Sequence, residues 1–149
     1  MEVLTAQSKG ARKAHFSARA ARVTTTARLH FGFLDPSGRG KRPFGSFGLS
    51  LDRPKTSLML APAQALEASG PESERALRYL QTLAQSCGGK SAYKLEIEEA
   101  IPSHAGLGSG TQLALAVGAA FAALEGLPLD PAQIAARLGR GARSGIGIA

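Results

Sequence analysis

The sequence predicts an α+β fold, and the length of the chain and two kinds of hydrophobic pattern support this. The chain has 149 residues, 44% of them hydrophobic, which is enough for one domain with its own core. Segments 22–33 and 91–101 alternate apolar and polar residues with the period of a half-buried strand. Segment 71–89 follows the helical period, and 111–125 is an apolar run of helical length. Together with two short extended segments, these elements predict a two-layer α/β sandwich.

The first 21 residues differ in composition from the rest of the chain. They are rich in Ala, Arg, Lys and Ser and contain a single acidic residue. We expect residues 1–21 to form a basic, disordered leader ahead of a domain at 22–149. A transit peptide is the alternative interpretation of this composition.

The net charge of +7 is unevenly distributed. Residues 1–55 carry eleven Lys and Arg against three Asp and Glu, residues 56–135 four against eight, and residues 136–149 three against none. With an acidic middle and only 5% aromatic residues, the chain lacks the basic, aromatic-bearing stripe typical of nucleic-acid binders. The positive charge outside the first 21 residues is as compatible with a small anionic ligand as with nucleic acid. A nucleic-acid partner is therefore not favoured.

The first predicted strand, 22–33, has two distinct faces. One face carries Val23, Thr25, Ala27, Leu29, Phe31 and Phe33, and the other carries Arg22, Thr24, Thr26, Arg28 and His30. Asp-Pro and Ser-Gly pairs then predict a flexible basic loop at 35–45. Segments 46–52 and 56–61 come next as two further short strands of the same sheet.

A helix is predicted at 71–89. Pro71 suits its first turn, Glu72 and Glu74 would lie near its positive end, and a glycine pair ends it. Its apolar stripe consists of Leu77, Leu80, Leu83, Ala84 and Cys87. Cys87 is therefore expected in the core.

The predicted strand at 91–101 carries Tyr93, Leu95 and Ile97 on one face and Lys94, Glu96 and Glu98 on the other. The glutamates of this segment are expected to face water. After the loop next to this strand, residues 111–125 are apolar on nearly all sides, which predicts a helix buried in the middle of the domain. A last short helix is predicted between its cap, Asp130, and Gly139, with Pro131 in its first turn.

The loop between the fourth strand and the buried helix, "IPSHAGLGSGT", is typical of a phosphate site. A helix N-terminus presents unpaired N–H groups and the positive end of the helix dipole, and glycines at 106, 108 and 110 let the backbone approach an anion closely. Ser103, Ser109 and Thr111 add hydroxyl donors. No Lys comes after the last glycine and the G-x-G-x-x-G spacing is missing, so neither the Walker nor the dinucleotide pattern applies. Glycines that serve only tight strand-to-helix packing are the alternative.

Residues 102–110, "PSHAGLGSG", resemble the P-x-x-x-G-L-G-S-S signature of the galactokinase, homoserine kinase, mevalonate kinase and phosphomevalonate kinase (GHMP) superfamily. The order of the elements also resembles its N-terminal domain, which implies a ribosomal protein S5 domain 2-like fold. Two departures stand out. Gly110 replaces the second Ser of the signature, and Gly147 stands where the kinases carry an Asp that assists phosphoryl transfer.

Three blocks together resemble a particular branch, the β-ribofuranosylaminobenzene 5'-phosphate (β-RFAP) synthases. They are "ARLHFGFLDPSG" at 27–38, "IPSHAGLGSGTQLALAVG" at 101–118 and "GRGARSGIGIA" at 139–149. Members of that family are longer, so the chain is interpreted as an N-terminal fragment without the C-terminal domain and, alone, inactive. The resemblance implies an enzyme, a glycosyltransferase of the pentosyltransferase type. It would condense 5-phosphoribosyl 1-pyrophosphate with a 4-amino- or 4-hydroxybenzoate and release CO2 and pyrophosphate, in methanopterin biosynthesis.

The resemblance also implies roles for individual residues. Pyrophosphate or phosphate would be held by Ser103, His104, Gly106, Leu107, Gly108, Ser109, Gly110, Thr111, Arg140, Arg143 and Ser144. Arg28 would bind the 5'-phosphate or the benzoate, His30 would act as a proton or hydrogen-bond partner, and Asp35 would hold a ribose hydroxyl or Mg²⁺. Each of these three residues has an ordinary strand or turn residue as its alternative interpretation.

Two other functions remain open. The first is an ATP-dependent small-molecule kinase of the same superfamily, and the second is a non-catalytic domain that binds RNA or another anion. The lone Cys87 and the scattered histidines predict neither a disulfide framework nor a zinc site. Mg²⁺ at Asp35 is the cofactor expected with the synthase, and ATP is expected only for the kinase. No segment has the length of a membrane span, and we expect a cytoplasmic protein that forms a homodimer.

Overall fold

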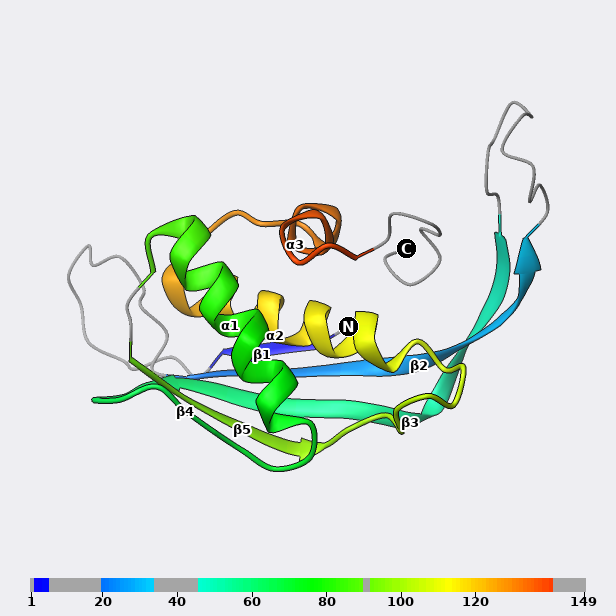
Figure 1. Ribbon diagram of the computed structural model, residues 1–149, viewed down its shortest axis with the longest axis horizontal. Helices are drawn as coiled ribbons and strands as arrows, with labels where there is room; N and C mark the ends of the chain where they lie inside the picture. Colours follow the sequence, from blue (N-terminus) through cyan, green and yellow to red (C-terminus); the bar gives the residue numbers. More distant parts are fainter. Residues whose placement is uncertain (1, 6–19, 34–45, 90–91, 141–149) are drawn as a thin grey trace.

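A computed structural model describes residues 2–5, 20–33, 46–89 and 92–140. Along the chain it contains the elements β1 (Glu2–Thr5), β2 (Ala21–Phe33), β3 (Ser46–Pro62), β4 (Glu67–Ser69), α1 (Ser73–Cys87), β5 (Tyr93–Glu99), α2 (Ser109–Glu125) and α3 (Pro131–Arg137). The strands form one sheet in the order β1-β2-β3-β5-β4, antiparallel except for the parallel β4–β5 pair. In Figure 1, α1 and α2 cover one face of this sheet and α3 lies over α2. The predicted α+β class is confirmed.

The sheet differs from the predicted one in three places. Residues 2–5, expected to be part of a disordered leader, form the edge strand β1 against β2. The two predicted segments 46–52 and 56–61 are one strand, β3, with an irregularity between them. Thr26 pairs with Lys55 and Arg28 pairs with Ser50, so the four residues 51–54 lie opposite the single residue Ala27. β4 is an additional short strand that adds to the free edge of β5.

Helix α2 occupies the centre of the core, as predicted. Twelve of its residues are buried, because the sheet lies on one side of it, α1 beside it and α3 above it (Figure 1). The Tyr93 and Phe121 rings meet edge to face with their centroids 5.9 Å apart. Gly118 lets α3 approach closely, since a Cβ there would lie 2.1 Å from Cγ2 of Ile134.

The buried stripe of α1 is rotated from the predicted one. Ala76, Tyr79, Leu80 and Leu83 are buried, whereas Cys87, expected in the core, is half-buried at its margin. Pro71 precedes the helix, which begins at Ser73. The position of α2 decides which side of α1 is covered, and the pattern of one helix does not contain that information.

The far half of the β2–β3 ribbon is uncovered. Val23, Thr25 and Ala27 are buried under α2, but Leu29 and Phe31 of the same predicted face are 39% and 57% exposed. Phe47 and Leu49 of β3 are exposed beside them, and the Phe31 and Phe47 ring centroids lie 5.5 Å apart. The expected burial of Leu29 and Phe31 was wrong because the ribbon extends beyond the N-terminus of α2 (Figure 1).

The glutamates of β5 face water as predicted, with 41%, 43% and 40% of the Glu96, Glu98 and Glu99 side chains exposed. Glu98 pairs with Arg22 across the sheet at 2.6 Å, and Glu96 pairs with Lys94 at 3.1 Å. Within the described ranges, none of the helices combines the length and the hydropathy needed to cross a membrane.

Candidate functional site

The glycine loop ends in an open helix N-terminus. Gly108, the N-cap of α2, has a φ of 73°, and Gly106 has the same value. This left-handed conformation favours glycine. Apart from the two chain neighbours, a Cβ at either position would meet no atom of the described residues within 4 Å. Close packing therefore does not account for these two glycines, and the space beside them is accessible to a ligand.

The first turn of α2 retains donors that the helix does not use. The N–H groups of Thr111 and Gln112 donate to the Gly108 carbonyl at 3.1 and 3.0 Å. Helical geometry gives the N–H groups of Ser109 and Gly110, which precede them, no acceptor within the helix. No side chain in the described part of the chain caps this turn, and the turn contains no acidic residue. Its partial positive charge is thus available to an anion.

Hydrogen bonds to β2 and β3 fix the loop in place. The Arg28 N–H donates to the Leu107 carbonyl at 3.1 Å, beside the irregularity in the β2–β3 ladder. The Thr56 hydroxyl accepts the Ile101 N–H at 3.2 Å, and the Thr25 hydroxyl donates to the Gln112 carbonyl at 3.2 Å. The fold thereby places the backbone of Arg28 against the glycine loop.

Arg140, which comes after α3, lies beside the first turn of α2. A Cβ on Gly110 would be in ordinary contact with Nη1 of Arg140, at 3.5 Å, so the guanidinium lies directly beside this glycine. Nη2 of Arg140 donates to the Tyr79 hydroxyl, and the guanidinium carbon lies 5.3 Å from the centre of the Tyr79 ring. A full positive charge therefore reinforces the partial charge of the helix terminus.

Ser103, at the start of the loop, faces α1 instead. Its hydroxyl donates to Oε1 of Glu72 at 2.5 Å and accepts from Nη1 of Arg75 at 3.4 Å. Arg75 also pairs with Glu72, with 3.4 Å between Nη1 and Oε2. The proton of the Ser103 hydroxyl is thus used by Glu72 in this structure.

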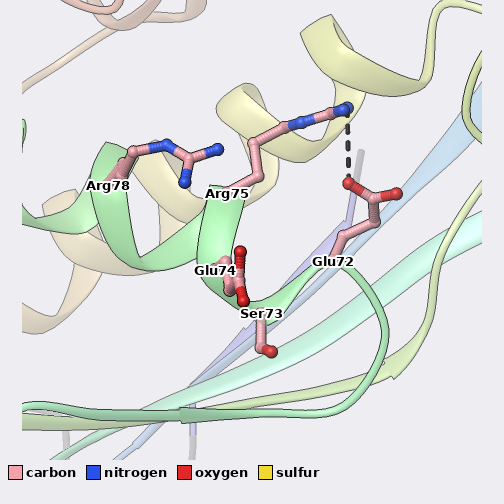
Figure 2. Close-up of a pocket in the computed structure, with 5 residues that line it drawn as sticks. All are labelled: Glu72, Ser73, Glu74, Arg75 and Arg78. Carbon is pink, nitrogen blue, oxygen red and sulfur yellow. Dashed lines mark ion pairs between the residues drawn. The ribbon is translucent and has the colours of Figure 1, made fainter.

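A small, open and polar pocket lies at this end of α1, with a volume of about 370 Å³. Figure 2 shows its lining, made up of Glu72, Ser73, Glu74, Arg75 and Arg78, with the Glu72–Arg75 pair at one side. The lining contains two acidic and two basic side chains, and one of each is already paired. The pocket therefore offers less to an anion than the N-terminus of α2 does.

The other predicted residues are spread over the loop, the strands and the undescribed segments. Ser109, Gly110 and Thr111 form the first turn of α2, while His104, with a φ of 61°, is exposed in the loop. His30 is half-buried on β2, two residues beyond Arg28.

Asp35, Arg143 and Ser144 lie outside the described residues, as does Gly147, and their roles stay predictions. No group of three or more His, Cys, Asp and Glu side chains gathers in the parts of the chain that the structure describes.

Three residues that contact the site were missed at the sequence level: Tyr79, Glu72 and Arg75. The i, i+3 spacing of Glu72 and Arg75 predicts a pair on one helix, and that signal was available. Tyr79 is 61 positions from Arg140, and no local pattern links the two.

The fold and the open glycine loop define a class, and the chain belongs to it: the profile described as "GHMP kinases N terminal domain" matches residues 74–149. The structure is similar to that of a homoserine kinase from Cytophaga hutchinsonii, with a TM-score of 0.58 at 14% identity, over 85% of this chain and 42% of that one. At such identity the likeness shows the fold alone.

Within that class, the resemblance to the β-RFAP synthase branch is confirmed by curated relatives. The beta-ribofuranosylphenol 5'-phosphate synthase of Archaeoglobus fulgidus is 37% identical over 130 residues, which are 86% of this chain and 41% of the relative. The protein of the same name from Methanothermobacter thermautotrophicus is 28% identical over 137 residues, which are 85% and 42%. The chain thus spans about two fifths of the length of these relatives.

Proposed function

We propose that this protein is a phosphoribosyl-transfer synthase whose glycine loop holds the pyrophosphate of 5-phosphoribosyl 1-pyrophosphate. The observation that carries the proposal is the open N-terminus of α2, where uncapped N–H groups, two left-handed glycines and the Arg140 guanidinium lie together. Such donors stabilise charge that develops on a leaving group. The names of the curated relatives, which specify a ribofuranosylphenol 5'-phosphate synthase, support this proposal.

The proposed reaction balances without an oxidant or reductant. The ring carbon that carries the carboxylate attacks C1' of the ribose, forming a carbon–carbon bond while the bond from C1' to the pyrophosphate oxygen breaks. The bond from that ring carbon to the carboxylate then breaks, and its electrons restore the aromatic ring as CO2 leaves. Because the relatives' name specifies a ribofuranosylphenol, we propose 4-hydroxybenzoate as the preferred acceptor, ahead of 4-aminobenzoate.

The proposed roles of the residues depend on their places. Ser109, Gly110 and Arg140 would bind the pyrophosphate, because they surround the open helix terminus. Arg28 would bind the 5'-phosphate or the carboxylate, since its backbone is fixed to the loop. His30 remains the proposed hydrogen-bond partner of a substrate, and Asp35 that of a ribose hydroxyl or Mg²⁺. A cytoplasmic place in methanopterin biosynthesis belongs to the same proposal.

Calorimetric titration and a product assay test this function. We expect the chain to bind inorganic pyrophosphate and 5-phosphoribosyl 1-pyrophosphate more tightly than ATP. We also expect a version of the protein as long as its relatives to release pyrophosphate only when a benzoate is added, and residues 1–149 alone to bind without turnover. Tight ATP binding with phosphate transfer to a small alcohol, and no pyrophosphate release, would favour the kinase instead.

A further inference from the structure

Tyr79 occupies a place on α1 that the proposed chemistry does not explain. It is a buried residue, 8% exposed, that reaches from α1 to Arg140, beyond the end of α3. Its hydroxyl accepts a hydrogen bond from Nη2 of Arg140, and its ring lies beside the guanidinium at 5.3 Å. A hydrogen bond and a cation–π contact from one side chain fix both the position and the plane of a guanidinium.

The backbone after α3 also directs Arg140 to this place. Gly139 has a φ of 64°, which turns the chain at the end of the helix. The Arg140 N–H then donates to the Ala135 carbonyl at 2.7 Å. The side chain leaves this turn between Tyr79 on α1 and Gly110 on α2. Three helices therefore determine the position of one charge.

The guanidinium still has an unused donor. Nε of Arg140 is buried and has no hydrogen-bond acceptor among the residues that the structure describes. Leaving a buried, charged donor unsatisfied is unfavourable. An anion at the first turn of α2 could accept from the guanidinium and from the helix N–H groups together.

We propose that Tyr79 is a positioning residue: it holds the Arg140 guanidinium beside Gly110 so that arginine and helix terminus bind one phosphoryl group of a pyrophosphate together. The inference rests on the proposed function for the identity of the anion. Gly110 is part of the same arrangement. It replaces the second Ser of the kinase signature, and the Arg140 guanidinium lies beside it. Tyr79 touches Arg140 and acts on the ligand only through it.

The test is a double-mutant cycle on the full chain, with inorganic pyrophosphate as the titrated probe. Arg140→Gln should weaken pyrophosphate binding about ten- to a hundredfold, and Tyr79→Phe about three- to tenfold, since each removes one or more hydrogen bonds. In the Arg140→Gln background, Tyr79→Phe should have no further effect. Arg140→Lys keeps the charge but not the planar contact and should fall between wild type and Arg140→Gln.

Two matched controls separate positioning from stability and from net charge. Tyr93→Phe removes a tyrosine hydroxyl that binds Glu125 at 3.0 Å, at the other end of the core. Arg137→Gln removes an exposed charge from the last turn of α3. Both should leave pyrophosphate affinity within about twofold, since neither contacts the site. Circular dichroism and thermal unfolding establish that each variant folds.

The outcomes distinguish the two proposals. Additive effects of Tyr79→Phe and Arg140→Gln, or an unchanged affinity in Tyr79→Phe, would overturn the positioning role while the pyrophosphate site stands. Pyrophosphate binding that is insensitive to Arg140→Gln but lost in Gly108→Val would also overturn it. Failure of the folded wild-type chain to bind pyrophosphate would remove the proposed function itself.

Discussion

The N-termini of α1 and α2 share an unusual backbone conformation but have opposite surroundings. The N-cap of each is in the left-handed conformation and makes no side-chain capping bond, with φ 61° at Glu72 and 73° at Gly108. At α1, the neutralising groups come from the protein: Glu72, Arg75 and Ser103 bind one another. At α2, no residue of the described chain takes that place, and Arg140 adds positive charge.

This difference shows how one local geometry serves two purposes. A non-glycine residue with positive φ costs free energy, and at Glu72 the hydrogen bond to Ser103 and the pair with Arg75 offset that cost. At Gly108 there is no such cost and no such network. We infer that the N-terminus of α1 holds the loop in place, whereas that of α2 is the place for a ligand.

The largest effect is expected from Gly108→Val, which would impair the open terminus directly. A β-branched residue at φ 73° costs about 1–3 kcal/mol, and its side chain would occupy the space beside the loop. Pyrophosphate binding should disappear while the far-UV circular dichroism stays close to wild type. Retained binding would show that the anion does not approach this turn.

An intermediate effect is expected from Gly110→Ser, which restores the residue of the kinase signature. The added Cβ would be in ordinary contact with Arg140, at 3.5 Å, but the hydroxyl must share the space of the guanidinium. Overpacking of this kind should weaken pyrophosphate binding about fivefold. Gly110→Ala, which adds the Cβ alone, is the control and should bind nearly as wild type. Tighter binding by Gly110→Ser would mean that its hydroxyl reaches the ligand directly.

The smallest effect on binding is expected from Ser103→Ala, at the closed end of the comparison. The substitution removes the hydrogen bonds to Glu72 and Arg75 and should lower the free energy of unfolding by about 1 kcal/mol. Urea denaturation measures that loss. Pyrophosphate affinity should change less than about twofold if the network is only structural. A loss of affinity of tenfold or more would show that Ser103 belongs to the phosphate-binding residues, as the sequence predicted.

Local patterns predicted the features that depend on one segment. The alternation of 22–33 predicted β2, and the apolar run of 111–125 predicted the buried helix α2. The same alternation could not show that cover ends after Ala27, because the position of α2 decides which half of the ribbon is buried. Phe31 therefore matched the pattern of a core residue and is exposed.

The candidate site likewise combines features that one segment determines with features that depend on packing. The glycines and the helix terminus were predictable, since both are consecutive in the sequence. The environment of Arg140 was not, because Tyr79 and Gly110 reach it from two other helices. The contact of Ser103 with Glu72 spans 31 positions and depends on how the loop crosses the end of α1. Composition suggested an anion site, and only the packing of the helices shows which groups surround it.

Gly118, in the core of the domain, affects the position of Arg140 at the candidate site. It lies inside α2 and has no polar group to offer, yet it sets how closely α3 can approach through Ile134. Arg140 is joined to α3 by a short turn, so any outward shift of the helix carries the guanidinium away from Gly110. A single methyl group added at Gly118 would therefore displace a charge of the proposed anion site. A search for variants with altered affinity would therefore recover this position in the interior alongside those of the loop.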